Sequence, residues 1–121
     1  MEKIRSFKDL FAWQKANEVA ARVYELTEQF PKSEQFGLTN QIQRAAVSIG
    51  SNIAEGFGRN TAKDKKQFYA IAKGSCFETE SQLLLAEKLG YTRNTDLKNL
   101  YSEMETVTKL ISGLMKSSVD R

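Results

Sequence analysis

The chain has 121 residues, of which 40% are hydrophobic and 27% charged, and its formal net charge is +3 at neutral pH. This length suits one domain with room for about four helices, and no run approaches the roughly 18 apolar residues that span a bilayer. No signal peptide is evident, so we expect a cytoplasmic protein without membrane contact. His is absent and Cys76 is the only Cys, which excludes an intrachain disulfide and Ser/His or Cys/His nucleophile pairs. We expect no metal, no cofactor and no enzymatic activity.

The first expected helix spans residues 7–30, with apolar side chains at spacings of three and four. Ser6 precedes it and Asp9 follows three positions later, which is the pattern of a capping box. Pro31 cannot continue a helix, because it lacks the backbone N–H that the helical ladder needs. The second expected helix therefore begins at residue 34, with Ser33 as its cap.

The second expected helix covers residues 34–57 and carries very little charge. Arg44 and Glu55 are its only charged residues after residue 34. A helix that faces water needs more polar side chains, so this one is expected to be enclosed on two sides, by the core and by another subunit. Gly56 and Gly58 stand near its end, where a glycine with positive φ often closes a helix.

The third expected helix spans residues 62–89. Thr61, with Asp64 three positions later, repeats the capping pattern at its start, and Gly90 closes it. Gly74 within this helix costs about 1 kcal/mol of helix propensity. We interpret it as the mark of a close helix contact.

The last expected helix covers residues 95–116, with Asn94 or Thr95 as its cap. The apolar seam of this helix stops at Met115, so residues 116–121 are expected to fray. No strand alternation occurs in the sequence. Four long helices joined by short turns predict an all-α, antiparallel up-down-up-down four-helix bundle that forms a single domain over residues 1–121.

One strip of the second helix is polar, and it faces the third helix in the predicted bundle. Its residues recur at spacings of three and four, and are Gln41, Arg44, Ser48, Asn52 and Glu55. In the structural interpretation, which we favour, they hydrogen-bond to Ser75, Glu78 and Gln82 and set the register of the bundle or of a subunit interface. In the functional alternative they line a pocket or channel, with Arg44 facing an anion. Arg44 and Glu55 are about 16 Å apart along the helix, so each needs a partner on another helix or chain.

Two large apolar residues of the third helix, Phe77 and Leu84, project almost opposite to its inner stripe. Single exposed apolar residues are common on soluble proteins. Together with the low charge of the second helix, they indicate a contact between subunits of a homo-oligomer.

Basic residues gather around the second turn and the start of the third helix; they are Arg59, Lys63, Lys65, Lys66 and Lys73. Side chains of this kind near a helix start hold phosphates, because they add positive charge to backbone N–H donors. The plain alternative is an ordinary solvated face, which the presence of Asp64 supports. In a ring that repeats the cluster around one face, the two interpretations weigh equally.

Three runs of the sequence resemble a known family: FKDLFAWQKANEVAARVYELTEQFP, EQFGLTNQIQRAAVSIGSNIAEGFGR and IAKGSCFETESQLLLAEKLGY. The family is that of bacterial four-helix-bundle proteins encoded within 23S ribosomal RNA intervening sequences, also called S23 proteins. The resemblance implies a ring-shaped homopentamer with a central channel and no established enzymatic activity. It also implies similarity in fold to the accessory variability determinant protein of diversity-generating retroelements, which works with a reverse transcriptase and nucleic acid.

By this resemblance all five strip residues sit at signature positions of the family, as do Gly56, Arg59, Gly74, Ser75 and Glu78. Two positions depart from the family pattern. Gln43 stands where a second arginine is common, which removes one positive charge per subunit. Gly50 stands where proline is frequent, which replaces a forced kink with a flexible point.

The sequence therefore predicts a non-enzymatic homo-oligomer, a pentamer by resemblance, that binds RNA or DNA non-specifically through its basic cluster. The alternative is a scaffold ring that docks a protein partner, with lysines that serve only solubility.

Overall fold

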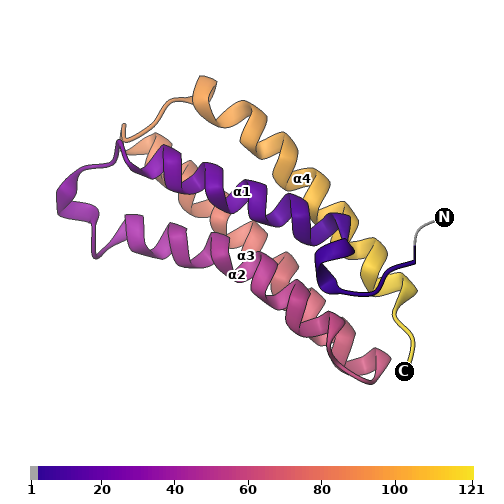
Figure 1. Ribbon diagram of the computed structural model, residues 1–121. Coiled ribbons are helices and arrows are strands. Elements are labelled where there is room, and N and C mark those ends of the chain that lie inside the picture. Colours follow the sequence, from indigo (N-terminus) through magenta and orange to yellow (C-terminus); the bar gives the residue numbers. More distant parts are fainter. Residues whose placement is uncertain (1–2) are drawn as a thin grey trace.

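Four long helices run alternately up and down the molecule (Figure 1). The computed structural model describes residues 3–121. Its helices are α1 (Phe11–Thr27), α2 (Leu38–Phe57), α3 (Ala62–Lys88) and α4 (Asn94–Ser117), with short 3₁₀ helices η1 (Phe7–Asp9) and η2 (Lys32–Glu34). No strand occurs in this described part of the chain. The prediction of an all-α, antiparallel four-helix bundle is confirmed.

Each helix contributes one apolar stripe to a single core. The largest side chains that are fully removed from solvent come from all four helices; they are Val19, Val23, Ile42, Ile49, Ile53, Leu83, Leu97, Leu100, Met104, Val107 and Ile111. These stripes match the predicted spacings of three and four. Burial of such side chains contributes about 1.5–3 kcal/mol each, so the core is the main source of stability.

The N-terminal helix is shorter than predicted. The capping box of Ser6 and Asp9 is present, but it closes only the single turn η1. Leu10 then adopts an extended backbone and buries its side chain, and α1 begins at Phe11. The predicted span of residues 7–30 is therefore wrong at both ends. The extended backbone at Leu10 interrupts the helical hydrogen bonds at the start, and α1 ends at Thr27.

The start of α2 also differs from the prediction. Residues 32–34 form η2, and α2 begins at Leu38 rather than at residue 34. The side chain of Ser33 caps neither helix. The cap comes from Glu34, whose Oε1 accepts a hydrogen bond from the backbone N–H of Leu38 at 3.1 Å. The hydroxyl of Tyr91 donates to Oε2 of the same carboxylate at 2.9 Å. A longer side chain therefore caps the helix from one turn further back.

The predictions for the remaining helix ends are confirmed in some cases and wrong in others. Thr61 caps α3 by accepting from the N–H of Asp64, and Gly90 has a φ of +81° after α3, as expected. Gly58 has a φ of −78°, so the expected positive φ at the end of α2 is wrong. No side chain caps α4, which begins at Asn94, so the cap predicted there is wrong.

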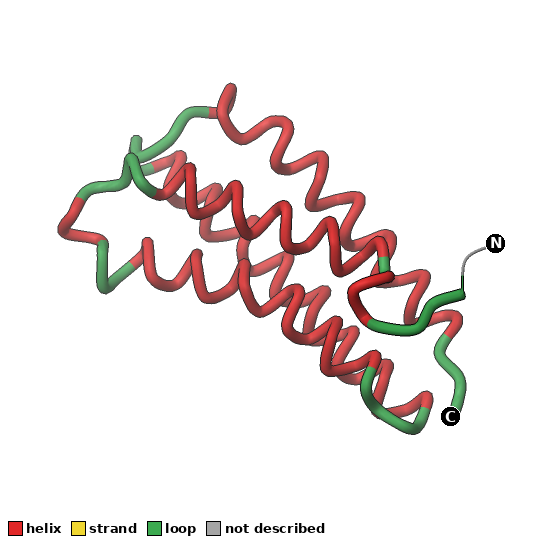
Figure 2. Tube along the Cα trace, in the orientation of Figure 1, coloured by secondary structure: helices red, strands yellow, loops and turns green. Residues whose placement is uncertain are grey.

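The segment after α4 is docked, which contradicts the expected fraying of residues 116–121. α4 itself continues to Ser117. Beyond it, the backbone N–H of Arg121 donates to the carbonyl of Asn60 at 2.7 Å, and Oδ1 of Asp120 accepts from the N–H of Ala62 at 2.7 Å. Both partners lie at the α2–α3 turn. Figure 2 shows that this turn and the C-terminus lie at the same end of the bundle.

Within residues 3–121, no helix combines the length and apolar character needed to cross a bilayer.

Candidate nucleic-acid interface

The tight α2–α3 turn determines where the basic residues lie. Gly56 is buried at its start, and a Cβ placed there would lie 2.7 Å from Cε1 of Tyr69 and 3.2 Å from the carbonyl oxygen of Lys65. The absence of a side chain at Gly56 therefore lets the end of α2 approach the start of α3. The chain reverses within Gly58–Thr61, and Thr61 caps α3.

Arg59 is held at the turn by two contacts. Its guanidinium donates to Oε2 of Glu55 at 3.1 Å and stacks over the ring of Phe68, 4.3 Å from the ring centroid. The arginine side chain keeps 44% of its surface exposed. A planar guanidinium fixed in this way still presents N–H donors to an anion. The expectation that Glu55 needs a partner on another helix or chain is wrong, since Arg59 follows one turn later.

Lys65 has a structural contact instead of a free ammonium group. Its Nζ donates to the carbonyl of Phe57 at 3.0 Å, at the negative end of the α2 dipole. Burial lowers the pKa of Lys65 below its ordinary value, and the nearby positive charge of Arg121 lowers this pKa further.

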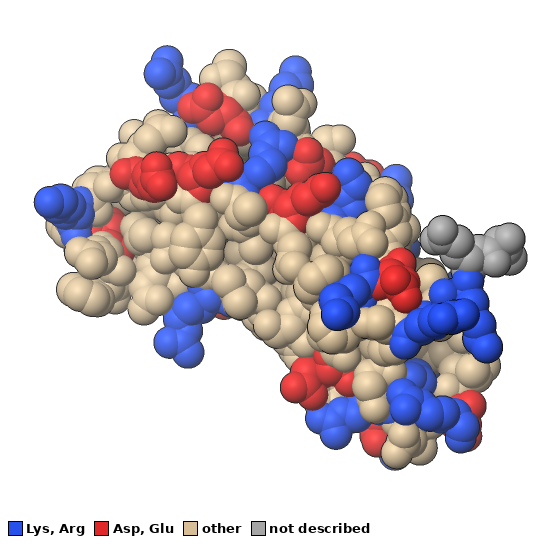
Figure 3. Space-filling view, viewed as in Figure 1, with Lys and Arg blue, Asp and Glu red and all other residues tan. Residues whose placement is uncertain are grey.

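Arg121 is a basic residue of this corner that the sequence pattern does not reveal. Its guanidinium donates to the carbonyls of Phe57 and Arg59, at 3.2 and 3.4 Å. The residues that it joins are about sixty positions earlier in the chain, so no local pattern indicates the contact. We define the corner cluster as Arg59, Lys63, Lys65, Lys66 and Arg121. Figure 3 shows Lys and Arg side chains gathered at this end of the molecule.

The other predicted lysines divide into two kinds. Lys63 and Lys66 are exposed on the first turns of α3, and no hydrogen bond or ion pair joins their side chains to any residue of the described range 3–121. Lys73 lies about two turns further on and donates to Oγ of Ser112 on α4 at 2.9 Å. Ser112 is neutral, so the charge of Lys73 remains uncompensated. The structure brings Lys63 and Lys66 to the corner and sets Lys73 apart from it, on the α4 side.

One of the bonds predicted between the polar strip of α2 and α3 is present. The hydroxyls of Ser48 and Ser75 are 3.0 Å apart and hydrogen-bond across the two helices. Nδ2 of Asn52 donates to the carbonyl and to Oγ of Ser48, at 2.8 and 2.9 Å. This part of the strip is a structural network that links α2 to α3.

The N-terminal half of the strip lines an open recess. Gln41, Arg44, Ser48 and Glu78 surround a volume of about 420 Å³. Among residues 3–121, no hydrogen bond or ion pair is formed by the Arg44 side chain, and Glu78 accepts instead from Nε2 of Gln82 on its own helix at 3.3 Å. The predicted bonds from the strip to Glu78 and Gln82 are therefore not formed within this chain.

Large apolar side chains are exposed on both flanks of α3. Phe77 and Leu84, predicted to project outwards, are about half exposed. Ile71 and Leu85 of the same helix, and Leu89 at its end, are also about half exposed. They lie at the margin of the stripe, where the neighbouring helices do not cover them. A Cβ built at Gly74 would have no heavy atom within 4 Å, so the predicted close contact at this glycine is absent among residues 3–121.

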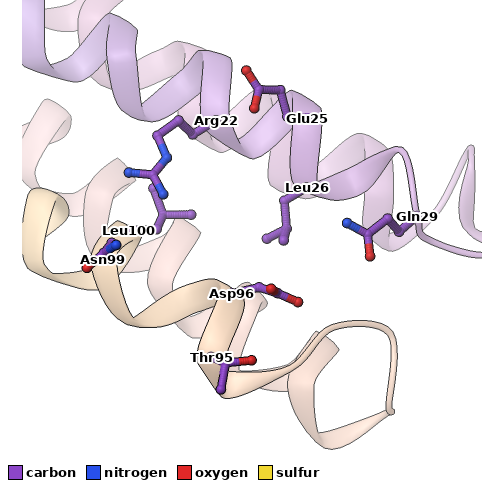
Figure 4. A pocket seen from close by; sticks show the side chains of 8 residues that line it. All are labelled: Arg22, Glu25, Leu26, Gln29, Thr95, Asp96, Asn99 and Leu100. Carbon is purple, nitrogen blue, oxygen red and sulfur yellow. The ribbon is translucent and has the colours of Figure 1, made fainter.

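A further polar cleft lies between α1 and the start of α4 (Figure 4). Its volume is about 340 Å³, and Arg22, which lines it, is paired with Glu103 at 2.7 Å.

Cys76 is buried in the core, and burial raises the pKa of its thiol to about 12, as expected for a small core residue. Among residues 3–121, no group of three or more His, Cys, Asp or Glu side chains is placed to hold a metal ion.

The antiparallel bundle, its polar α2 strip and its tight α2–α3 turn define a small four-helix-bundle protein. Residues 8–113 match the family of 23S rRNA-intervening sequence proteins, and the chain belongs to this family. Its fold is similar to the crystal structure of a protein of unknown function from the S23 ribosomal protein family of Bacteroides thetaiotaomicron. The two share 25% sequence identity and a TM-score of 0.79 over 88% of this chain and 99% of that chain. No curated protein matches the sequence.

Proposed function

We propose that the protein is a homo-oligomer, a pentamer as its family resemblance implies, that binds RNA or DNA non-specifically through phosphate contacts at the corner cluster. The observation that carries the proposal is the exposed pair Lys63 and Lys66, placed beside a fixed Arg59 at the start of α3. Phosphate contacts supply most of the affinity of non-specific nucleic-acid binding. No catalytic step is part of this proposal.

The electrostatics of the corner support an anionic partner. Lys65 and Arg121 add positive charge while they donate to carbonyls at the end of α2. Lys63 and Lys66 lie on the first turns of α3, where the helix dipole adds positive potential. Asp64 and Asp120 offset part of this charge. Repetition of the corner in several subunits multiplies the attraction, because each copy contributes its own phosphate contacts.

The proposed subunit contact uses the uncharged face of α1 and α2. Tyr24 of α1 and Val47 of α2 are both nearly half exposed. Figure 3 shows uncharged side chains over the middle of the face formed by these helices. Such a face loses little favourable hydration when a second copy covers it. Light scattering after gel filtration tests this: a monomer at all concentrations would remove the oligomer from the proposal.

The nucleic-acid test compares charge reversals at the two ends of the bundle. The test variant is Lys63→Glu/Lys66→Glu, which leaves Lys65 in place because of its bond to Phe57. The control variant is Lys32→Glu/Lys88→Glu, which makes the same change in net charge at exposed positions of the opposite end. Binding of a labelled oligonucleotide is measured by filter retention at rising salt.

The wild type should bind at low salt and weaken steeply as salt rises. Each lost phosphate contact lowers the magnitude of the salt slope by about 0.7–0.9. The test variant should therefore lose affinity and salt dependence, and the control should lose much less. Absence of wild-type binding at low salt, or equal losses in the two variants, would contradict the proposal.

The alternative is a scaffold ring that docks a protein partner without direct contact to nucleic acid. The exposed residues Leu85 and Leu89, one turn apart at the end of α3, favour it, since adjacent exposed apolar side chains are typical of docking sites. Purification from native cells after nuclease treatment separates the alternatives. A scaffold retains its protein partner after this treatment, whereas a nucleic-acid-binding protein loses the proteins that were attached to it only through nucleic acid.

A further inference from the structure

We propose that the groove between α3 and α4 binds a single-stranded segment of RNA or DNA, with one base stacked on Phe77 and its flanking phosphates held by lysines. The inference rests on the proposed function and adds to it the type of nucleic acid and a second contact surface. Lys66 belongs to both surfaces, but the other groove residues lie further along α3 and on α4, outside the corner cluster.

The contact between Lys73 and Ser112 places two rows of lysines along this groove. On α3, Lys66 precedes Lys73 by two turns and shares its face. On α4, Lys109 and Lys116 lie three residues before and four residues after Ser112, so they share the face of that serine. Four ammonium groups therefore follow the groove from the corner towards the middle of the bundle.

Phe77 continues the α3 row, one turn beyond Lys73. Its side chain is 53% exposed. It borders a recess of about 400 Å³ between the two helices, whose other lining residues include Tyr101, Met104 and Thr108. An exposed aromatic face beside a recess of this size offers a stacking surface for a nucleobase, and lysines nearby offer contacts for its phosphates.

The far side of the recess carries a further lysine, Lys98. Lysines therefore stand on both sides of the aromatic residue, as a strand whose backbone passes over the groove requires. The row is exposed at Lys66, Lys109 and Lys116. The ion pair of Lys109 with Glu105 is 3.3 Å long, but both side chains are more than two-thirds exposed, so it offsets little of the attraction.

Two carboxylates, Glu80 and Glu105, also line the recess. They repel a phosphate, so the recess itself suits the base and the lysine rows suit the backbone. Carboxylate oxygens accept hydrogen bonds from exocyclic amino groups such as that of cytosine. The hydroxyl oxygen of Tyr101, which also lines the recess, is buried and has no hydrogen-bond partner among residues 3–121.

A duplex does not meet these requirements, because its bases are already paired and stacked inside the helix. Stacking on Phe77 needs a base that is free of that arrangement. The groove therefore distinguishes single strands from duplexes, whereas the corner cluster, which contacts phosphates only, does not.

The test measures fluorescence anisotropy of a labelled pyrimidine single strand and of a duplex of equal length. The variants are Phe77→Leu, which keeps an apolar side chain but removes the aromatic face, and Phe77→Trp, which keeps that face. The matched control is Phe36→Leu at the opposite end of the bundle, where the side chain is 88% exposed. Gel filtration with light scattering is run on each variant.

Phe77→Leu should weaken single-strand binding by about fivefold or more, the lower end of the range for base–aromatic stacking, and leave duplex binding unchanged. Phe77→Trp and Phe36→Leu should bind single strands within about twofold of the wild type. Equal loss for Phe36→Leu, no loss for Phe77→Leu, or a smaller oligomer in Phe77→Leu would overturn the inference; the last would identify Phe77 as a subunit contact. If the wild type binds neither nucleic acid, the proposed function fails as well, whereas wild-type binding without a Phe77 effect refutes the groove alone.

Discussion

Gly56→Ala should destabilise the protein although alanine is the better helix former. A Cβ at this position would lie 2.7 and 2.9 Å from two ring atoms of Tyr69 and 3.2 Å from the backbone oxygen of Lys65. Tyr69 is 3% exposed, so neither its ring nor the backbone of α3 can move away freely. Overpacking of this kind costs up to about 3 kcal/mol, and the gain in helix propensity returns about 1 kcal/mol. We expect a net loss of about 2 kcal/mol.

The matched control is Gly74→Ala in the middle of α3. No heavy atom lies within 4 Å of a Cβ built there, and the residue is exposed. The substitution should therefore keep only the gain in propensity and stabilise the protein by about 0.5–1 kcal/mol. The two variants make the same chemical change, so the difference between them isolates the contact of α2 with α3.

The assay is reversible unfolding by urea, followed by far-UV circular dichroism at one protein concentration, since oligomerisation makes stability depend on concentration. For a domain of this size, a loss of about 2 kcal/mol also lowers Tm by about 8 °C. Wild-type stability in Gly56→Ala would refute the close-approach argument. Destabilisation by Gly74→Ala would show that another copy of the chain covers this glycine.

Two further predictions concern hydrogen bonds of the Glu34 carboxylate and of the Ser48 and Ser75 hydroxyls. The pKa of Glu34 lies below its ordinary value of 4.5, chiefly because its carboxylate accepts a hydrogen bond from the N–H of Leu38 and next because it accepts one from Tyr91. The ionised carboxylate therefore stabilises the folded state above pH 4.5, and this stabilisation is lost as the pH falls through the lowered pKa. Glu34→Gln should remove this part of the acid dependence, which thermal unfolding at about pH 6 and about pH 3 measures; an unchanged dependence would refute the role of the cap. Ser48→Ala and Ser75→Ala should each cost about 0.5–1.5 kcal/mol, and the double variant less than the sum, with additive losses as the contradicting result.

Much of the fold was predictable from local pattern. The apolar stripes of α1 and α4 follow from residue spacing, because a helix of 3.6 residues per turn brings side chains three and four apart to one face. Thr61 caps α3 and Gly90 leaves it with positive φ, as their chemistry indicates. The lysines after Arg59 were visible as a basic cluster. These features depend on neighbours within a few positions, so local sequence is enough to predict them.

The contacts between distant segments were decided by the tertiary structure. The Glu34 carboxylate that caps α2 also accepts a hydrogen bond from Tyr91, which lies 57 positions later in the chain. The packing of α2 against α3, and not the turn type, explains Gly56. Arg121 joins the corner only because α4 ends beside the α2–α3 turn. Periodicity tells which side of a helix is apolar, but the width and position of the neighbouring helix decide which of those side chains are covered and which remain free to bind a partner.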